Sequence, residues 1–201
     1  MSWEPGVWMQ YIFRKPFGIH SPFLYNFAVG CIFADAKDQL FAPIEQNRAA
    51  LKAQGINVPD PKTCRLLYRT AAYFQVNEIL EAETRQNITR EYFKLSRRDV
   101  NLSLTDIDTL ADYADNRFNG LIFIDAAADT AKLAKSFPLW SGKLHHNSVV
   151  IMAGIRNGRL KKSHWRNLSA NMHVTLALDL GNLGYLFFNQ ALSKQNIRVG
   201  F

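Results

Sequence analysis

Glycine is absent from a long central stretch of this chain, between Gly55 and Gly120. Residues 76–87, within that stretch, read as a short buried strand followed by a turn into a helix. In a nucleotide-binding α/β domain such a turn needs glycines, because the backbone must approach the ligand and the helix N-terminus must point at it. The sequence therefore predicts the frame of a binding fold without the glycines of its binding loop.

Cysteines and long apolar runs are also scarce. The two cysteines, Cys31 and Cys64, do not make a disulfide framework, and no metal-ligand spacing surrounds either one. No run approaches the roughly 18 apolar residues of a membrane span, and the N-terminus lacks the apolar core of a signal peptide. These absences predict a cytoplasmic protein that has no metal site and no membrane partner.

Acidic residues are nearly missing from the last third of the chain. Residues 130–201 hold ten Lys and Arg but only one acid, Asp179, whereas residues 1–129 hold 14 basic and 16 acidic residues. This asymmetry predicts a basic surface on the C-terminal part, which would attract polyanions or acidic partners. A solvated basic face that binds nothing is the simpler interpretation of the same pattern.

The rest of the composition is typical of a folded domain. Hydrophobic residues make up 48% and charged residues 20% of the 201 positions, which predicts one domain with a sizeable core. The pairs Ser21-Pro22 and Asp60-Pro61 give the cap and first-turn signals of two helices in the N-terminal part. The helices expected there cover residues 6–15, 21–32, 41–54 and 60–74.

Strands and helices alternate from residue 78 onward. Continuous apolar runs predict buried strands, and Gly181-Asn182 predicts the turn of a closing hairpin. The expected strands cover residues 78–82, 100–105, 120–125, 148–153, 174–180 and 183–188, and the expected helices cover 84–95, 106–115, 131–139 and 159–171. This alternation predicts an α/β fold with a mostly parallel sheet, to which the C-terminal hairpin adds one antiparallel strand.

This order of elements resembles that of class I S-adenosylmethionine-dependent methyltransferases. It is most similar to a group of small bacterial methyltransferase-like proteins that begin with an aromatic helix and a Gly-x-His-Ser-Pro-Phe motif, here residues 18–23. Further matching stretches are residues 66–74, 78–81, 118–125, 148–152 and 183–188. The resemblance implies a single domain with a Rossmann-like three-layer sandwich, in which an N-terminal helical extension (1–75) packs on a methyltransferase-type core (76–201).

The resemblance also locates a cofactor site, at the end of the first core strand. In the family this strand ends in an acid, and a glycine-bearing loop then holds the methionine and ribose parts of the cofactor. Glu81 matches the acid, but Glu83 and Asn87 stand at the glycine positions. A carboxylate where the backbone must touch the ligand obstructs it both sterically and by the cost of desolvation. We therefore interpret Glu81 as a vestige of a cofactor site.

Three further positions depart from the chemistry of the family. Too few residues separate Glu83 from Gly120 for all the usual units, so we expect one βα unit to be missing, and no ribose-binding acid can be named. The place of residues 84–98 in the sheet order stays open. Asp125 leads into three alanines where the family has Asp-Gly-x-His. Residues 152–155 read Met-Ala-Gly-Ile where related enzymes have paired aspartates that hold a metal or act in catalysis.

Several single residues have both a functional and a structural interpretation. Asp125 follows a parallel strand at the edge where α/β folds bind ligands, so it is either a cofactor contact or a helix N-cap. His20 precedes a helix cap, and we interpret it as structural. His145 and His146 point in different directions as neighbours, which disfavours a shared metal.

One helix is expected to carry a stripe of positive charge. Arg159, Lys162 and Arg166 fall at positions i, i+3 and i+7, on one helix face, whereas Leu160 and Leu168 are expected to face the sheet. Such a basic stripe would contact phosphates without reading a base sequence. The alternative is a solvated outer face.

Three hypotheses fit these observations. We prefer a methyltransferase-like protein that has lost S-adenosylmethionine binding and catalysis, with no cofactor and no catalytic residue, and that acts as a binding or scaffold protein in a homodimer or with a protein partner. The second is an S-adenosylmethionine-dependent methyltransferase with an atypical cofactor loop that uses Glu81 and Asp125. The third is a polyanion-binding or nucleic-acid-binding module that uses Arg159, Lys162 and Arg166.

Overall fold

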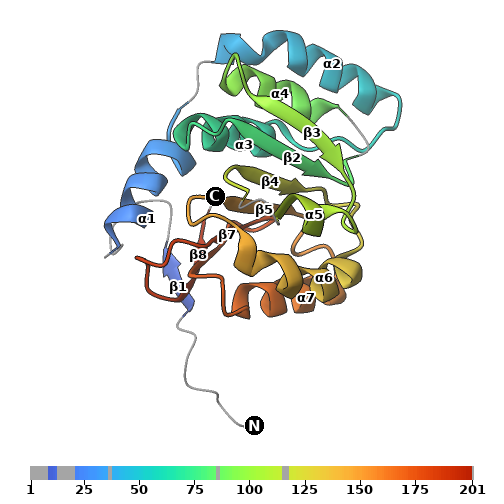
Figure 1. Ribbon diagram of the computed structural model, residues 1–201. Coiled ribbons are helices and arrows are strands. Elements are labelled where there is room, and N and C mark those ends of the chain that lie inside the picture. Colours follow the sequence, from blue (N-terminus) through green and yellow to red (C-terminus); the bar gives the residue numbers. More distant parts are fainter. Residues whose placement is uncertain (1–8, 13–20, 36–37, 85–86, 115–117, 201) are drawn as a thin grey trace.

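A single sheet forms the centre of the molecule in the computed structural model, which describes residues 9–12, 21–35, 38–84, 87–114 and 118–200 (Figure 1). The strands are β1 (Met9–Ile12), β2 (Glu78–Ala82), β3 (Asn101–Thr105), β4 (Leu121–Ile124), β5 (Val149–Ala153), β6 (Leu176–Asp179), β7 (Leu183–Phe187) and β8 (Gln195–Val199). Their order across this eight-stranded sheet is β1-β8-β6-β7-β5-β4-β2-β3.

Strand direction follows the predicted pattern. Strand β7 runs antiparallel to both of its neighbours, β5 and β6, and the other pairings of the described strands are parallel. Parallel neighbours require crossover connections, and helices supply most of them. The predicted α/β fold with a mostly parallel sheet and a C-terminal antiparallel hairpin is confirmed.

Two of the helices begin where their sequence signals predict. The side chain of Ser21 accepts a hydrogen bond from the N–H of Leu24, and that of Asp60 accepts one from the N–H of Thr63. The helical segments are α1 (Pro22–Phe27), the π-helix η1 (Ala28–Ile32), the 3-10 helix η2 (Asp38–Phe41), α2 (Ala42–Ala53), α3 (Pro61–Tyr73), α4 (Ile88–Ser96), α5 (Leu110–Ala114), α6 (Thr130–Trp140), the 3-10 helix η3 (Ser141–Lys143) and α7 (Arg159–Ala170). No helix of the described residues is both long and apolar enough to cross a membrane.

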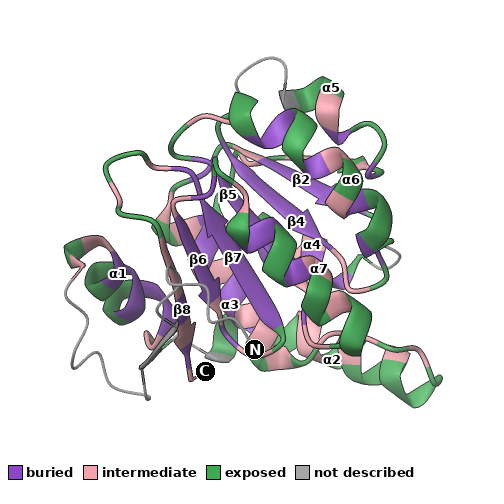
Figure 2. Ribbon diagram, turned by 90° about the horizontal axis from the view of Figure 1, so that it is seen from below, coloured by how far each residue is buried: buried purple, intermediate pink, exposed green. Residues whose placement is uncertain are grey.

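The helices cover both faces of the sheet and make three layers. Side chains of α1, η1, α3 and α4 pack in one buried cluster on one face, and those of α5, α6 and α7 pack in another on the opposite face. Figure 2 shows the buried strands between helices whose outer sides are exposed. Helix α2 has no buried residue and lies outside α4. This arrangement is the predicted three-layer sandwich.

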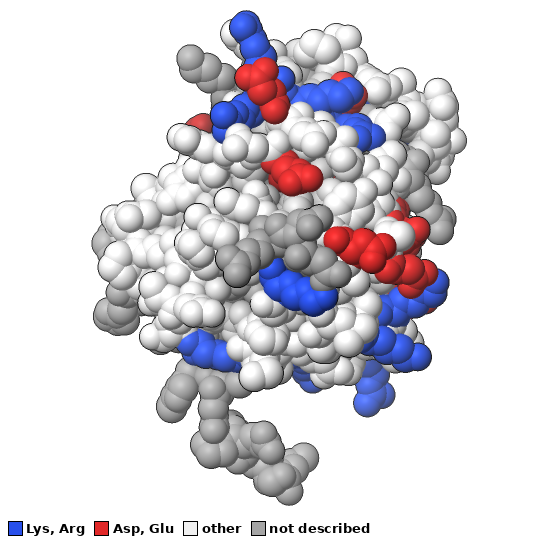
Figure 3. Space-filling model, viewed as in Figure 1, with Lys and Arg blue, Asp and Glu red and all other residues white. Residues whose placement is uncertain are grey.

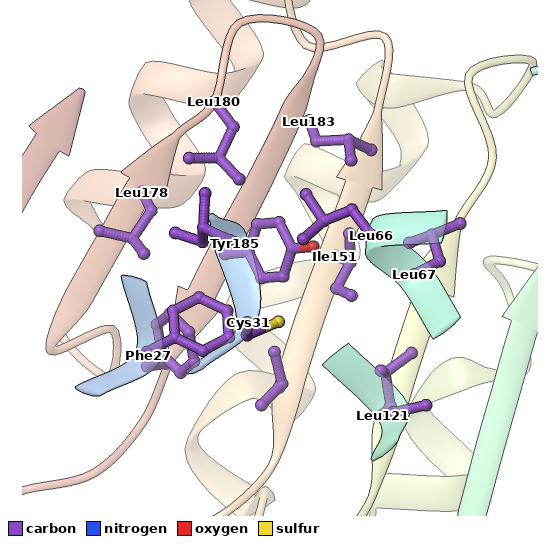
Figure 4. Packing of buried hydrophobic residues seen from close by; sticks show 14 of the residues in the cluster. Phe27, Cys31, Leu66, Leu67, Leu121, Ile151, Leu178, Leu180, Leu183 and Tyr185 are labelled. Carbon is purple, nitrogen blue, oxygen red and sulfur yellow. The ribbon is translucent and has the colours of Figure 1, made fainter. Parts of the chain in front are cut away.

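The first of these clusters joins the N-terminal helices to the sheet. Phe27, Cys31 and Leu66 point toward Tyr185 of β7 and Ile151 of β5 (Figure 4). They exclude water from this face of the sheet and stabilise the fold through apolar burial.

Tyr185 is fully buried and needs a polar partner. Its hydroxyl lies 3.0 Å from the Thr70 hydroxyl, which donates in turn to the carbonyl of Leu66 at 2.8 Å. Burial raises the pKa of Tyr185 far above its ordinary value, so the phenol stays neutral. The hydrogen bonds satisfy a group that would otherwise cost free energy in the core.

The middle of the chain is shortened, as expected. The described residues between Ala82 and Leu121 form α4, β3 and α5 only. In the usual doubly wound order a further strand lies outside the second one, whereas here β3 is the edge of the sheet. One βα unit is therefore missing, and residues 84–98, as far as they are described, form α4 and its flanks rather than a strand.

Two expectations about the first third and the end of the chain were wrong. Residues 9–12, inside the expected helix 6–15, form β1, which pairs in parallel with β8. Neither strand was foreseen, because a four-residue or five-residue strand has a weak local signal and depends on a partner far away in the sequence. The histidine of the Gly-x-His-Ser-Pro-Phe motif, His20, lies outside the described residues.

Candidate functional site

The order of the strands reverses at β2, which lies between β3 and β4. Open α/β sheets bind ligands in the crevice beyond the carboxyl ends of the strands at such a switch point. Glu81 lies near the end of β2, and Asp125 directly follows β4 and donates its backbone N–H to the carbonyl of Ala82 at 3.1 Å. The structure therefore brings the two predicted cofactor residues to adjacent strand ends.

Glu81 is fully buried, and α4 engages its carboxylate. The Thr89 hydroxyl donates to Oε1 at 2.8 Å, and Arg90 Nε lies 3.7 Å from Oε2. Burial raises the pKa of Glu81; the Thr89 hydrogen bond and the charge of Arg90 oppose part of this shift, and the charge of Asp125 adds to it. Oε2 itself accepts no hydrogen bond from the described residues.

Helix α4 packs directly beside the end of β2. Arg90 donates from Nη2 to the carbonyl of Leu102 at 2.6 Å, which ties α4 to the edge strand β3. Phe93 is buried between the helix and the sheet, where its ring lies 5.9 Å from that of Phe123 on β4, and Ile88 is buried in a separate cluster with Phe41 and Cys64. The segment that the sequence left unplaced therefore fills the space beside this strand end.

The turn after β2 keeps a glycine-like backbone without glycine. Glu83 has φ of 59°, in the left-handed region that disfavours residues with a Cβ. Its N–H donates to the carbonyl of Thr105 at 3.2 Å, and its Oε1 accepts a weak hydrogen bond from the N–H of Ile107 at 3.4 Å. Asn87, at the second glycine position, has an ordinary φ of −76°. The turn is thus bound to the last residue of β3 and to the loop after it.

The loops after β4 and β5 lie in contact. Gly154 has φ of 70°, and a Cβ at this position would lie 2.9 Å from the Cβ of Ala126. Lys161 of α7 also donates a hydrogen bond to the carbonyl of Ala126. These contacts hold the loops after β4 and β5 and helix α7 together at the carboxyl edge of the sheet.

Asp125 is not a helix cap. Its Oδ1 accepts the N–H of Ala127 at 2.7 Å, which makes a local turn, and α6 is capped instead by Asp129, which accepts the N–H of Ala131 and Lys132. The N-cap interpretation of Asp125 was therefore wrong, and a turn-forming role replaces it. Its carboxylate is half-buried at the switch point.

One acid at this edge was missed by the sequence reasoning. Asp106 directly follows β3, beside the loop after β2, and its position after a strand was the available signal. Its carboxylate accepts the N–H and the hydroxyl of Thr109 at 2.8 and 2.9 Å. The Thr109 hydrogen bonds lower the pKa of Asp106, so this acid serves the turn into α5.

The predicted basic stripe lies on the outer face of α7. Arg159, Lys162 and Arg166 are exposed and make no ion pair with any described residue. Leu168 is buried, but Leu160 is 73% exposed, so its predicted contact with the sheet was wrong. Figure 3 shows basic side chains gathered over α6 and α7 and acidic ones near α5.

The other predicted polar residues do not form a site. Asp179, the acid of the C-terminal part, pairs with Arg156 at 2.6 Å and Arg198 at 3.5 Å. The rings of His145 and His146 lie against each other, with centroids 4.0 Å apart and ring planes inclined by 38°, so the expectation that they point in different directions was wrong. Within the described residues, no group of three or more His, Cys, Asp or Glu is placed to hold a metal ion.

Solved structures place this fold among methyltransferases. A caffeoyl-CoA O-methyltransferase candidate from Staphylococcus aureus is 16% identical over 75% of this chain and 96% of its own, with a TM-score of 0.55. The methyltransferase PaMTH1 of Podospora anserina, solved with SAH, is 13% identical over 76% of this chain and 88% of its own, also with a TM-score of 0.55. No family model and no curated protein sequence matches the chain. The chain therefore has the Rossmann-like fold of class I methyltransferases.

Proposed function

We propose that this methyltransferase-like protein has lost S-adenosylmethionine binding and catalysis and acts by binding, as a homodimer or beside a different protein. The observation that carries the proposal is the turn after β2. Glu83 stands there at a glycine position of the family. Its backbone bonds to Thr105, the last residue of β3, and its carboxylate bonds to Ile107 in the loop that follows. The polar groups of Glu83 therefore bond within the protein, and we infer that they are not available to a ligand.

The surrounding residues fit S-adenosylmethionine poorly. The carboxylate of Glu81 already accepts the Thr89 hydroxyl and faces Arg90. The loops after β4 and β5 lie so close at Ala126 and Gly154 that even a Cβ on the glycine would be 2.9 Å from the Cβ of Ala126. No described residue at this edge is therefore assigned a catalytic role.

The rival function is a methyltransferase with an atypical cofactor loop. It is favoured by two buried polar atoms beside the turn, Glu81 Oε2 and the Thr84 hydroxyl, which have no hydrogen-bond partner among the described residues. Buried polar groups are normally satisfied, so a ligand or an ordered water would supply what they lack.

A thermal-shift titration separates the two functions. We expect neither S-adenosylmethionine nor its demethylated product, SAH, to raise the melting temperature. A ligand at about 100 times its Kd stabilises a fold by about 2.7 kcal/mol, and such a gain shifts the melting temperature of a 200-residue protein by about 5–10 °C.

PaMTH1, which was solved with SAH, is the positive control for the titration. A saturable shift of the wild-type chain that Glu81→Gln or Thr84→Val abolishes would establish the rival function. Light scattering tests whether the protein forms a homodimer, because it measures the molar mass in solution. A monomer mass at all protein concentrations would exclude the homodimer.

A further inference from the structure

A pocket of about 200 Å³ lies at the edge of the sheet opposite to the switch point. It is lined by residues just before β2, β4 and β5, by the end of β7 and by the start of α1. We propose that this amino-edge pocket binds a neutral, planar ring with an amide-type edge, such as a nucleobase. The inference uses none of the residues that carry the proposed loss of S-adenosylmethionine binding.

Three phenyl rings line the pocket. Phe23, Phe74 and Phe187 contact one another there, with ring centroids 5.3 Å apart for Phe23 and Phe187 and 5.9 Å apart for Phe74 and Phe187. Aromatic faces attract planar rings through stacking and apolar burial. Phe23 ends the Gly-x-His-Ser-Pro-Phe motif, so this motif supplies part of the wall of the pocket.

Side-chain amides surround these rings. Each amide offers one acceptor oxygen and two N–H donors, which is the chemistry that recognises the edge of a nucleobase or a carboxamide. The Oδ1 atom of Asn189 accepts the N–H of Ala191 at 3.0 Å, which leaves its NH₂ group to donate. The lining amides are Gln75, Asn77, Asn119, Asn147 and Asn189.

The lack of acidic side chains and of Lys or Arg among the described lining residues, which leaves His146 as their titratable member, decides the class of ligand. None of the described residues that line the pocket is Lys, Arg, Asp or Glu, in a chain that holds 24 Lys and Arg and 17 Asp and Glu. A charged ligand would lose its hydration without an ion partner, which is costly. The ligand is therefore neutral.

The size of the pocket limits the ligand further. A volume of about 200 Å³ is below the range of roughly 300–1,000 Å³ for drug-sized ligands, so one small ring is the expected occupant. A more open hollow of about 500 Å³ adjoins it and shares His146 and Asn189. A substituent on the ring would extend past these two side chains.

Two-dimensional amide NMR with small probes tests the proposal. Uracil and nicotinamide are expected to give saturable shifts that centre on the amides of Asn77, Asn119 and Asn147. Benzoate, a charged ring, and acetamide, an amide without a ring, are expected to give none. No saturable shift with either ring probe, or equal binding of benzoate or acetamide, would overturn the proposal.

Matched variants locate the binding. Asn119→Ala and Asn147→Ala change exposed side chains and are each expected to weaken uracil binding about fivefold, the usual worth of one hydrogen bond. Asn167→Ala, an exposed amide on α7, is the control and should leave the affinity unchanged. Equal affinity of all three variants would place the ligand elsewhere and contradict the proposal.

Binding of S-adenosylmethionine at the amino-edge pocket can be told apart from binding at the switch point. S-adenosylmethionine contains an adenine, so its titration is repeated in Asn147→Ala. A shift that this variant abolishes and that Glu81→Gln preserves belongs to the amino-edge pocket. A shift that Glu81→Gln abolishes and Asn147→Ala preserves belongs to the switch point. That result would contradict the proposed loss of cofactor binding and would leave the proposal for the amino-edge pocket unaffected.

Discussion

Glu81 is a buried acid whose pKa is raised by its burial, and the stability of the fold should report this. A carboxyl with a raised folded-state pKa stabilises the fold fully below its unfolded pKa of about 4.3, and this contribution disappears as the pH rises through the folded pKa. We expect the wild type to lose stability from pH 4 to pH 8 relative to Glu81→Gln, in urea unfolding at fixed ionic strength.

Glu78→Gln is the control for this experiment, because it removes a carboxylate from the same strand at a half-buried position. It should not reproduce the pH-dependent difference. If the wild type instead gained stability with rising pH relative to Glu81→Gln, the ion pair with Arg90 would outweigh the cost of burial. The pKa of Glu81 would then be lowered and not raised.

Single residues were predictable where a side chain acts on its own neighbours in the sequence. The caps at Ser21 and Asp60 depend on bonds three residues away, and so they could be read directly. The left-handed backbone of Glu83 could not be predicted from the sequence, because local propensity opposes it and contacts with the end of β3 and the loop after it stabilise it. Asp125 failed as a cap for a different reason: α6 begins at Thr130, so Asp129, four residues on from Asp125, caps it.

Helix α7 should give the molecule weak, salt-sensitive affinity for double-stranded DNA of any sequence. The basic stripe of Arg159, Lys162 and Arg166 is exposed and free of ion pairs with described residues. Three phosphate contacts predict a slope of about −3 in a plot of log affinity against log salt concentration. Changing all three residues to glutamine should abolish DNA binding, as measured by fluorescence anisotropy of labelled DNA at low salt.

A second triple variant, Lys52→Gln, Lys62→Gln and Arg98→Gln, removes the same charge from exposed positions on other elements. It should retain most of the affinity. An equal loss of DNA affinity in both triple variants would show that net charge, and not α7, accounts for the attraction. If the wild type does not bind DNA, the basic stripe is a solvated face.

Elements were predictable in proportion to their length and to the regularity of their pattern. The apolar runs of β4 and β5 and the amphipathic pattern of α3 identified these elements correctly. Strands β1 and β8 were missed because their pairing joins the two ends of the chain, and no short stretch of sequence carries that information. Leu160 was misplaced since the helical period alone does not locate the boundary of the buried face.

At the scale of the whole molecule, the question is whether the N-terminal helical extension unfolds with the core. Thr70 of α3 bonds to Tyr185 of β7 within a cluster that spans both parts. Burial raises the pKa of Cys31 to about 11 and that of Cys64 to about 12, so both thiols should resist labelling until the extension unfolds. One cooperative transition is therefore expected.

The two parts carry separate probes for this transition. In a Trp3→Phe, Trp8→Phe background the fluorescence comes from Trp140 and Trp165, which are buried in the core on the other face of the sheet. We expect the urea midpoints of tryptophan fluorescence and thiol labelling to coincide. Labelling at a clearly lower urea concentration would make the extension a separate unit, since only a shared core forces helices on one face and tryptophans on the other to unfold together.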